Sequence, residues 1–270
     1  MITAKGRSIE YIEQGIGPPV LFIPGSFSTP AAWAGIQASL PKNYRFISTS
    51  LCGYGLTDEL RSSDNVGIEN LVRVIEKVAR RIGEPVHLVG HSFGGIVAFA
   101  SALSGTIDVL SISTFEATPA AILEDRGHSR LYKEMKRISS AFAESYFSGE
   151  PDAARLVIDF WGGDGAFFSM PEEVQAYCRK TASTNILDWH TGFSFQAKIS
   201  DYKSLTMPNL LVRGANSNAQ VLKITEALGS SIPNCRSAVI DGAGHFLITS
   251  HSEACAHTLA EFLNGVSAKN

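Results

Sequence analysis

Few of the features that mark disulfide-rich or metal-binding proteins occur in this sequence. Only four of its 270 residues are cysteine. They are Cys52, Cys178, Cys235 and Cys255. None belongs to a C-x-x-C pair or stands near a histidine at ligand spacing, so we expect reduced cysteines in the packed interior and no metal site. His87 and His91 are four residues apart but flank the end of an expected strand rather than lie on a helix, which argues against a metal site there too.

Long apolar runs and a strong excess of charge are also missing. No run approaches the roughly 20 apolar residues that span a bilayer. Residues 1–14 alternate polar and apolar side chains and contain no apolar segment of a signal peptide, so we expect a cytoplasmic protein. The formal net charge of −3 is too small to favour nucleic acid or an anionic membrane as partner. A small-molecule substrate is the expected partner, and nothing in the sequence indicates an oligomeric state.

What the chain does contain is an alternation of short apolar runs with helical patterns. Strands are expected over 20–23, 45–49, 86–89, 109–113, 209–213 and 237–240, with an edge strand over 8–14. Helices are expected over 31–40, 68–82, 93–103, 220–228 and 252–263. This alternation is typical of an α/β fold with a mostly parallel, doubly wound sheet.

Residues 119–198 interrupt the alternation. They carry amphipathic helical patterns, clearest over 128–147 and 171–182, and no buried strand. Because this block begins and ends between two strands of one sheet, we interpret it as a helical cap, or lid, inserted into a core made of 1–118 and 199–270. The alternative is a separate helical domain.

The strongest motif is G-x-S-x-G at residues 90–94, with Ser92 at its centre. A buried strand precedes it and a helix follows, which is the context that a nucleophile elbow requires. The backbone N–H of Phe93, at the start of that helix, is placed to donate to a developing oxyanion. The alternative is a chance glycine-rich turn between a strand and a helix.

A serine hydroxyl needs a base, and His245 is the candidate. It lies in G-A-G-H-F, residues 242–246, after the last expected strand and before the final helix. A second oxyanion donor is expected from the loop after strand 20–23, where we favour the backbone N–H of Ser26 or Phe27. The alternatives are that His245 is an ordinary surface residue and that the loop after strand 20–23 is a plain turn into the next helix.

Together these segments resemble the α/β-hydrolase family, in its serine-nucleophile branch with a helical cap. Residues 52–57, C-G-Y-G-L-T, are similar to the family's R-G-x-G-x-S loop, and residues 208–212, P-N-L-L-V, to its P-x-L-L-V strand. The resemblance implies the α/β-hydrolase fold and hydrolysis without cofactor or metal. Ser92 in place of an aspartate argues against haloalkane dehalogenase or epoxide hydrolase chemistry.

Three positions depart from the family pattern. Pro24-Gly25 stands where the family often has His-Gly, and Ser50 where it often has aspartate before the glycine loop. Ser217 stands where the family's acid commonly follows the strand after the cap. Some branches carry the acid at the end of the strand before the cap, and Glu116 matches that position. The alternatives are an imidazole oriented by Asn218 or water, and Asp241 as acid.

The expected reaction is cleavage of a small, partly apolar carboxylic ester or lactone by a triad of Ser92, His245 and Glu116. Three aromatic residues of the cap are expected to line the substrate pocket, unless they only pack cap to core. They are Trp161, Phe167 and Phe168. The alternatives are carbon–carbon bond hydrolysis, cofactor-free perhydrolysis, and a ligand-binding receptor that keeps the triad without turnover.

Overall fold

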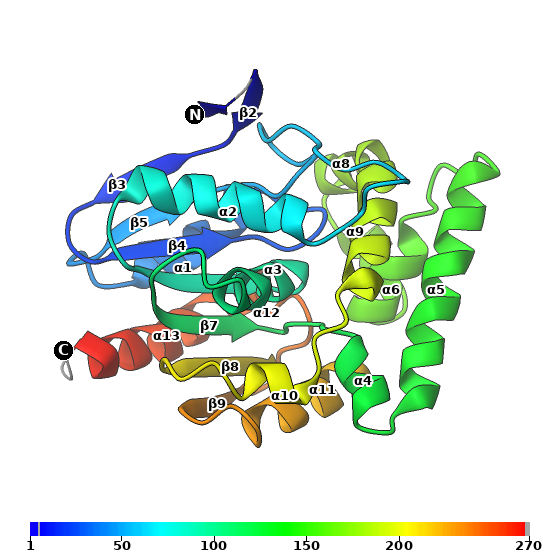
Figure 1. Cartoon of the computed structure of the whole chain (residues 1–270). Helices are drawn as coiled ribbons and strands as arrows, with labels where there is room; N and C mark the ends of the chain where they lie inside the picture. Colours follow the sequence, from blue (N-terminus) through cyan, green and yellow to red (C-terminus); the bar gives the residue numbers. More distant parts are fainter. Residues whose placement is uncertain (5, 268–270) are drawn as a thin grey trace.

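A seven-stranded sheet forms the centre of the molecule (Figure 1). In the computed structural model, which describes residues 1–4 and 6–267, the strand order is β3-β5-β4-β6-β7-β8-β9. Only β3 is antiparallel to its neighbour. The strands are β3 Ile12–Gly15, β4 Pro19–Ile23, β5 Arg45–Ser48, β6 Val86–His91, β7 Val109–Phe115, β8 Asn209–Gly214 and β9 Cys235–Ile240. The predicted mostly parallel sheet is confirmed.

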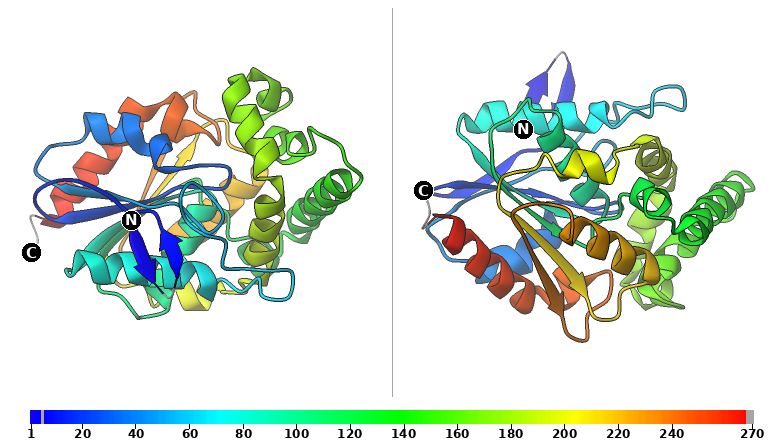
Figure 2. Two further views of the ribbon diagram at one scale, coloured as in Figure 1. Left: turned by 90° about the horizontal axis from the view of Figure 1, so that it is seen from above. Right: turned by 60° about the horizontal axis from the view of Figure 1, so that its bottom comes forward.

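Helices cover both faces of this sheet, as the left view of Figure 2 shows. One face carries η1 Pro30–Trp33, α1 Ala34–Ser39, α12 Leu247–Ser250 and α13 Ser252–Ser267. The other carries α2 Glu69–Ile82, α3 Phe93–Leu103, α10 Ile199–Tyr202 and α11 Ala219–Gly229. In β4, Val20 and Phe22 pack into the first layer and Leu21 and Ile23 into the second. A strand buried on both sides is apolar throughout, which explains its continuous apolar run.

The edge strand expected over 8–14 is divided in two. Strand β2, Arg7–Ile9, pairs with β1, Ile2–Ala4, as a separate hairpin, and only β3 joins the main sheet. The chain turns at Glu10, whose backbone N–H donates to Thr57 Oγ1 at 3.0 Å and whose carboxylate accepts from Ser50. These tertiary contacts override the simple alternation from which one strand was predicted.

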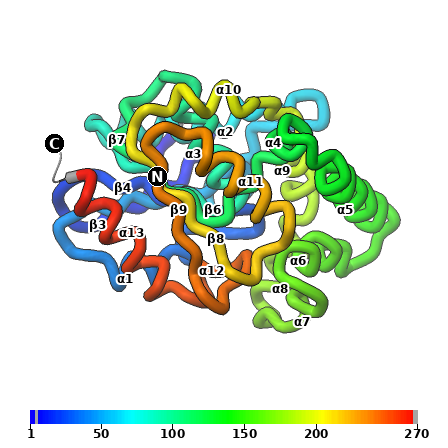
Figure 3. The backbone as a smooth tube through the Cα atoms, turned by 90° about the horizontal axis from the view of Figure 1, so that it is seen from below, coloured from blue at the N-terminus to red at the C-terminus, as the bar shows by residue number. Residues whose placement is uncertain are grey.

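A helical layer lies between β7 and β8 in the chain and beyond the carboxyl ends of the parallel strands (Figures 1 and 3). Its helices are α4 Ala121–Asp125, α5 Ser129–Phe147, α6 Arg155–Gly162, α7 Ala166–Ser169, α8 Glu172–Lys180 and α9 Ala182–Ser194. They share a core of their own that includes Phe142, Ile158, Phe167 and Cys178. This layer occupies residues 119–198, and all of those residues are described and none is in a strand.

The cysteines are unpaired, and three are buried, whereas Cys235 is only half-buried. Across residues 1–4 and 6–267, no helix is long and apolar enough to cross a membrane. In the same described part of the chain, no three His, Cys, Asp or Glu side chains converge as metal ligands.

Two buried histidines of β6 make the fold sensitive to acid. Burial lowers the pKa of His87 to about 4, and burial with the nearby His245 lowers that of His91 to about 3. The unfolded chain takes up these protons near pH 6.5, so acid favours the unfolded state below that pH. For His87 alone we expect a loss of about 2 kcal/mol in the free energy of unfolding between pH 7 and pH 5.

Urea unfolding at several pH values measures this loss. His87→Gln should reduce the difference in the free energy of unfolding between pH 7 and pH 5 by about 2 kcal/mol, because glutamine does not titrate. His190→Gln is the matched control, since His190 is exposed and its removal should leave the difference unchanged. Equal pH dependence in the parent and in His87→Gln would contradict the prediction.

Candidate active site

Ser92 lies at the sharp turn between β6 and α3. Its φ of +51° is rare for a residue with a side chain, and its backbone N–H donates to the carbonyl of Phe115 at 2.9 Å. A Cβ on Gly90 would collide with the backbone of Gly94, and a Cβ on Gly94 would collide with the Pro24 carbonyl. The two glycines are therefore required by close packing of the turn against α3 and β4, and the turn presents the serine hydroxyl at the carboxyl end of the sheet.

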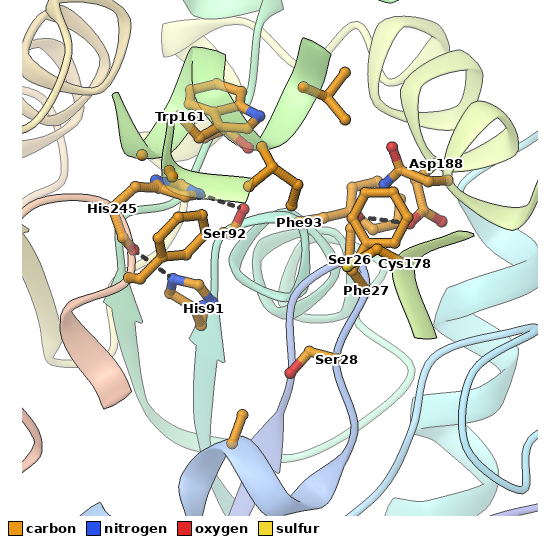
Figure 4. A pocket seen from close by; sticks show the side chains of 18 of the residues that line it. Ser26, Phe27, Ser28, His91, Ser92, Phe93, Trp161, Cys178, Asp188 and His245 are labelled. Carbon is orange, nitrogen blue, oxygen red and sulfur yellow. Dashed lines mark hydrogen bonds between the residues drawn. The ribbon is translucent and has the colours of Figure 1, made fainter. Parts of the chain in front are cut away.

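Hydrogen bonds join Ser92, His245 and Glu116 in one line. The Ser92 Oγ lies 2.9 Å from Nε2 of His245 (Figure 4). Nδ1 of the same ring lies 3.1 Å from Oε2 of Glu116. With the proton on Nδ1, the ring donates to Glu116 and its Nε2 is free to accept the serine proton. The structure thus brings together three side chains that stand far apart in the sequence.

Glu116 follows directly after β7 with a φ of +56°. Its Oε1 accepts hydrogen bonds from the Gly214 N–H at 2.7 Å and from the hydroxyl of Ser217. Burial alone would raise the pKa of Glu116, but the hydrogen bonds and the positive form of His245 hold it below its ordinary value. Glu116 is therefore a carboxylate near neutral pH. Asn218 does not orient the imidazole and instead caps α11 by accepting from the N–H of Val221 at 3.1 Å.

The contact between Ser217 and Glu116 is a feature that sequence reasoning did not find. Ser217 stands where the family pattern has its acid, so the sequence indicates only an absence. In the structure this serine donates to the Glu116 carboxylate, which directly follows the neighbouring strand β7. Positional comparison alone does not reveal such a contact, because it depends on the register between β7 and β8.

His91 supports the loop that carries His245. Its Nε2 lies 2.9 Å from the backbone carbonyl of His245, and the two rings pack with centroids 5.3 Å apart. Because the pKa of His91 is so far below neutral, the ring is uncharged and its single N–H donates to that carbonyl. His91 thus fixes the backbone of His245.

The residues expected to supply oxyanion donors line the same cavity as Ser92. The N–H of Phe93 is at the first turn of α3, where it has no partner within the helix. Opposite it runs the loop after β4, and a Cβ on Gly25 there would press against His91 and Ser92. Ser26 and Phe27 line the same cavity as Ser92, and Phe27 has a φ of +56°.

A cavity of about 990 Å³ opens over Ser92, between the sheet and the helical layer. Trp161 forms part of its wall and stacks on the His245 ring, with centroids 4.8 Å apart and an interplanar angle of 21°. The expectation that Phe167 and Phe168 line the pocket is wrong. Phe167 is fully buried in the core of the helical layer, and Phe168 is 58% exposed to solvent. Helix α7 thus directs Phe167 into the core of the helical layer and Phe168 toward solvent.

A buried charged cluster, also not found from the sequence, adjoins the cavity. Asp188 of α9 accepts hydrogen bonds from Ser26, Tyr54 and Arg61. Figure 4 shows Asp188 beside Ser26 and Phe27, on the far side of Phe93 from His245. This cluster links the helical layer to two loops of the sheet.

Comparison with known proteins agrees with the observed fold. Residues 20–258 match the alpha/beta hydrolase family. The chain is 24% identical to a fluoroacetate dehalogenase of Burkholderia sp, over 95% of this chain and 90% of that protein. It is also 24% identical to a pimeloyl-[acyl-carrier protein] methyl ester esterase of Aliivibrio salmonicida, over 95% and 96%. The solved esterase of Exiguobacterium antarcticum shares the fold, with a TM-score of 0.75, 18% identity and 97% coverage of both chains.

Proposed function

The chain belongs to the alpha/beta hydrolase family, and on that premise we propose that it is a serine hydrolase acting on a small carboxylic ester or lactone. The observation that carries the proposal is the continuous line of hydrogen bonds from Ser92 through His245 to Glu116. The ester-cleaving relative supports the substrate class. The activity named for the dehalogenase relative is not proposed for this chain, because the proposed nucleophile here is the hydroxyl of Ser92.

In the proposed mechanism, Ser92 Oγ attacks the carbonyl carbon while His245 Nε2 takes its proton. The carbonyl oxygen becomes an oxyanion, which accepts from the backbone N–H of Phe93 and of Ser26 or Phe27. His245 then protonates the leaving alcohol, and an acyl-enzyme remains. Water, deprotonated by His245, hydrolyses the acyl-enzyme and releases the acid. Glu116 stabilises the imidazolium in both steps, and the face of Trp161 adds a cation–π contact.

The helical layer is proposed to act as the cap that shapes the substrate site. Its contribution to the cavity is mostly apolar and includes Val157, Ile158, Trp161 and Trp189. No lysine or arginine lines the cavity among the described residues, whereas Asp164 and Glu173 do. A carboxylate on the substrate would lose its hydration without gaining a cationic partner, so the cavity favours neutral acyl chains.

A pair of esters of equal length tests this preference for neutral chains. We expect p-nitrophenyl valerate to exceed p-nitrophenyl hydrogen glutarate about 100-fold in kcat/KM, because only the glutarate buries an unpaired charge. The Glu173→Lys variant should bring the two kcat/KM values closer together, because it places a cation at the wall of the cavity. A preference for the glutarate in the parent protein would contradict the assignment.

Trp161 is expected to set the range of chain lengths. Trp161→Ala removes a large apolar wall, so KM for p-nitrophenyl hexanoate should rise roughly tenfold, with a smaller change for the acetate. Phe168→Ala is the matched control, because Phe168 is exposed and does not line the cavity. Identical chain-length profiles in the parent and in Trp161→Ala would count against the proposed site.

Covalent labelling tests the proposed function itself. A fluorophosphonate should add one adduct to the folded protein, and peptide mapping should find it on Ser92. The same protein should hydrolyse short p-nitrophenyl esters. An adduct at another residue would refute the nucleophile, and labelling of Ser92 without turnover of any ester or lactone would favour a ligand-binding receptor.

A further inference from the structure

Asp188 is a carboxylate of the helical layer that is held between three segments of the chain. Its Oδ2 accepts from the Ser26 hydroxyl at 2.5 Å and from the Tyr54 hydroxyl at 2.7 Å. Its Oδ1 accepts from Nη1 of Arg61 at 2.7 Å. Asp188 is 2% exposed and Arg61 is 6% exposed. Helix α9 is thus tied to the loop after β4 and to the loop after β5 by buried hydrogen bonds.

Stability alone does not account for this cluster. Burial raises the pKa of Asp188, and the positive charge of Arg61 acts in the opposite direction. Desolvation of both charges largely offsets their attraction, so a buried ion pair is weak evidence for stability. Arg61 is further held by Glu59 at 2.8 Å and by the Cys52 carbonyl at 3.2 Å. What the cluster achieves is a fixed position for the Asp188 carboxylate.

The fixed carboxylate acts on the loop that carries a proposed oxyanion donor. Among residues 24–28, all described, Ser26 is the only one whose side chain makes a hydrogen bond, and its partner is Asp188. The next residue, Phe27, has a φ of +56°, which costs energy and persists only where the surroundings impose it. The Ser26 hydroxyl is thus the side-chain anchor of the segment that carries these backbone N–H groups.

We propose that Asp188 is a positioning residue that holds the oxyanion loop through the hydroxyl of Ser26. The inference rests on the proposed function and assigns to the cap a part in catalysis besides shaping the pocket. Because the loop contacts the carbonyl oxygen most strongly when that oxygen is negative, a displaced loop lowers kcat more than it raises KM. If the role were merely structural, loss of the contact would lower the melting temperature and leave both kcat and KM of the folded protein unchanged.

The test compares two variants that each remove one donor to the same carboxylate oxygen. Ser26→Ala keeps the backbone N–H but loses the anchor, so kcat for p-nitrophenyl butyrate should fall roughly 10- to 100-fold with KM within threefold. Ser26→Thr keeps a hydroxyl and should restore most of kcat. Tyr54→Phe also removes a donor, but Arg61 still holds Asp188, so this variant should lose thermal stability and keep kcat within threefold.

Binding of butylboronic acid, which forms a tetrahedral adduct with the serine, provides a second readout. Its inhibition constant should rise in Ser26→Ala in parallel with the fall in kcat and should be unchanged in Tyr54→Phe. The proposal is overturned if Ser26→Ala keeps kcat within threefold, or if the two variants lose kcat equally. Failure of the proposed function is distinguished at the outset, because the parent protein would then show neither ester turnover nor an adduct on Ser92.

Discussion

Replacing Ser92 by alanine should lower kcat for p-nitrophenyl butyrate by about 10⁵- to 10⁶-fold. Alanine removes the atom that forms the acyl-enzyme, so only direct attack by water remains. That attack still benefits from the oxyanion donors and from binding, which sets the residual rate. The fold should persist, because alanine adopts the φ of +51° at the elbow no less readily than serine.

Steady-state kinetics at high enzyme concentration measure this loss, and thermal melts confirm folding. Ser101→Ala is the matched control in α3, the helix that follows Ser92, since the Ser101 hydroxyl is buried without a hydrogen-bond partner. It should keep the parent kcat. More than 1% of the parent activity in Ser92→Ala, with no contaminating parent enzyme, would show that another group is the nucleophile.

The second large effect is expected from Glu116→Gln, which should lower kcat about 10⁴-fold. Glutamine keeps the shape of the side chain but cannot stabilise the imidazolium that forms when Ser92 loses its proton. The amide also lacks the charge that the Gly214 N–H and the Ser217 hydroxyl are placed to stabilise.

A control separates the loss of the triad acid from a general effect of removing a buried carboxylate. Glu10→Gln changes another buried glutamate. Its carboxylate accepts hydrogen bonds from Ser50 and from the Leu56 N–H, neither of which belongs to the proposed triad. This variant should lower the melting temperature and keep kcat. Activity of Glu116→Gln within a few-fold of the parent, in a folded protein, would refute Glu116 as the acid.

Partial rescue is the further expected result. Because the Ser217 hydroxyl lies within hydrogen-bond distance of Glu116, the double variant Glu116→Gln, Ser217→Asp places a new carboxylate beside the former one. Such a carboxylate is expected to support His245 from the end of the neighbouring strand. The kcat of the double variant should therefore be at least roughly tenfold higher than that of Glu116→Gln. A double variant no better than Glu116→Gln would mean that the two positions do not converge on the same imidazole nitrogen.

The strands and the elbow were predictable because their signals are local. A buried strand, a glycine-flanked serine and a small-residue helix each have a pattern readable in a few residues, as Val86 to Leu103 illustrate. Since parallel strands bring their carboxyl ends to one edge, the sequence positions of Ser92 and His245 also predicted a shared site. Glu116 was predicted from the resemblance to branches of the family that carry the acid at the end of the strand before the cap. The N-terminal hairpin was not predicted, because Glu10 leaves the alternating path through contacts with distant loops.

The helical layer was the least predictable region. Its helical content follows from periodicity, but which side of a helix faces the cavity depends on how the helices pack. Phe167 and Phe168 are adjacent in sequence and lie in different environments, neither of them the cavity. Asp188 had no sequence signal at all, since a single aspartate on an amphipathic helix is ordinarily a solvent-facing residue. Its partners, Ser26 and Arg61, are more than 100 residues away.

The hydrogen bond between Ser217 and Glu116 bears on how such a site changes during evolution. A triad acid cannot move to another strand through an ancestor that lacks it, because the intermediate would be nearly inactive. Here the two positions touch, so one substitution at Ser217 gives a chain with both carboxylates before either is lost. Two adjacent carboxyl groups that share a proton form a tolerable intermediate, from which either position can be retained. A chain that carries both carboxylates keeps one of them at this place throughout the exchange, so the proposed acid can pass between the ends of β7 and β8 without an inactive intermediate.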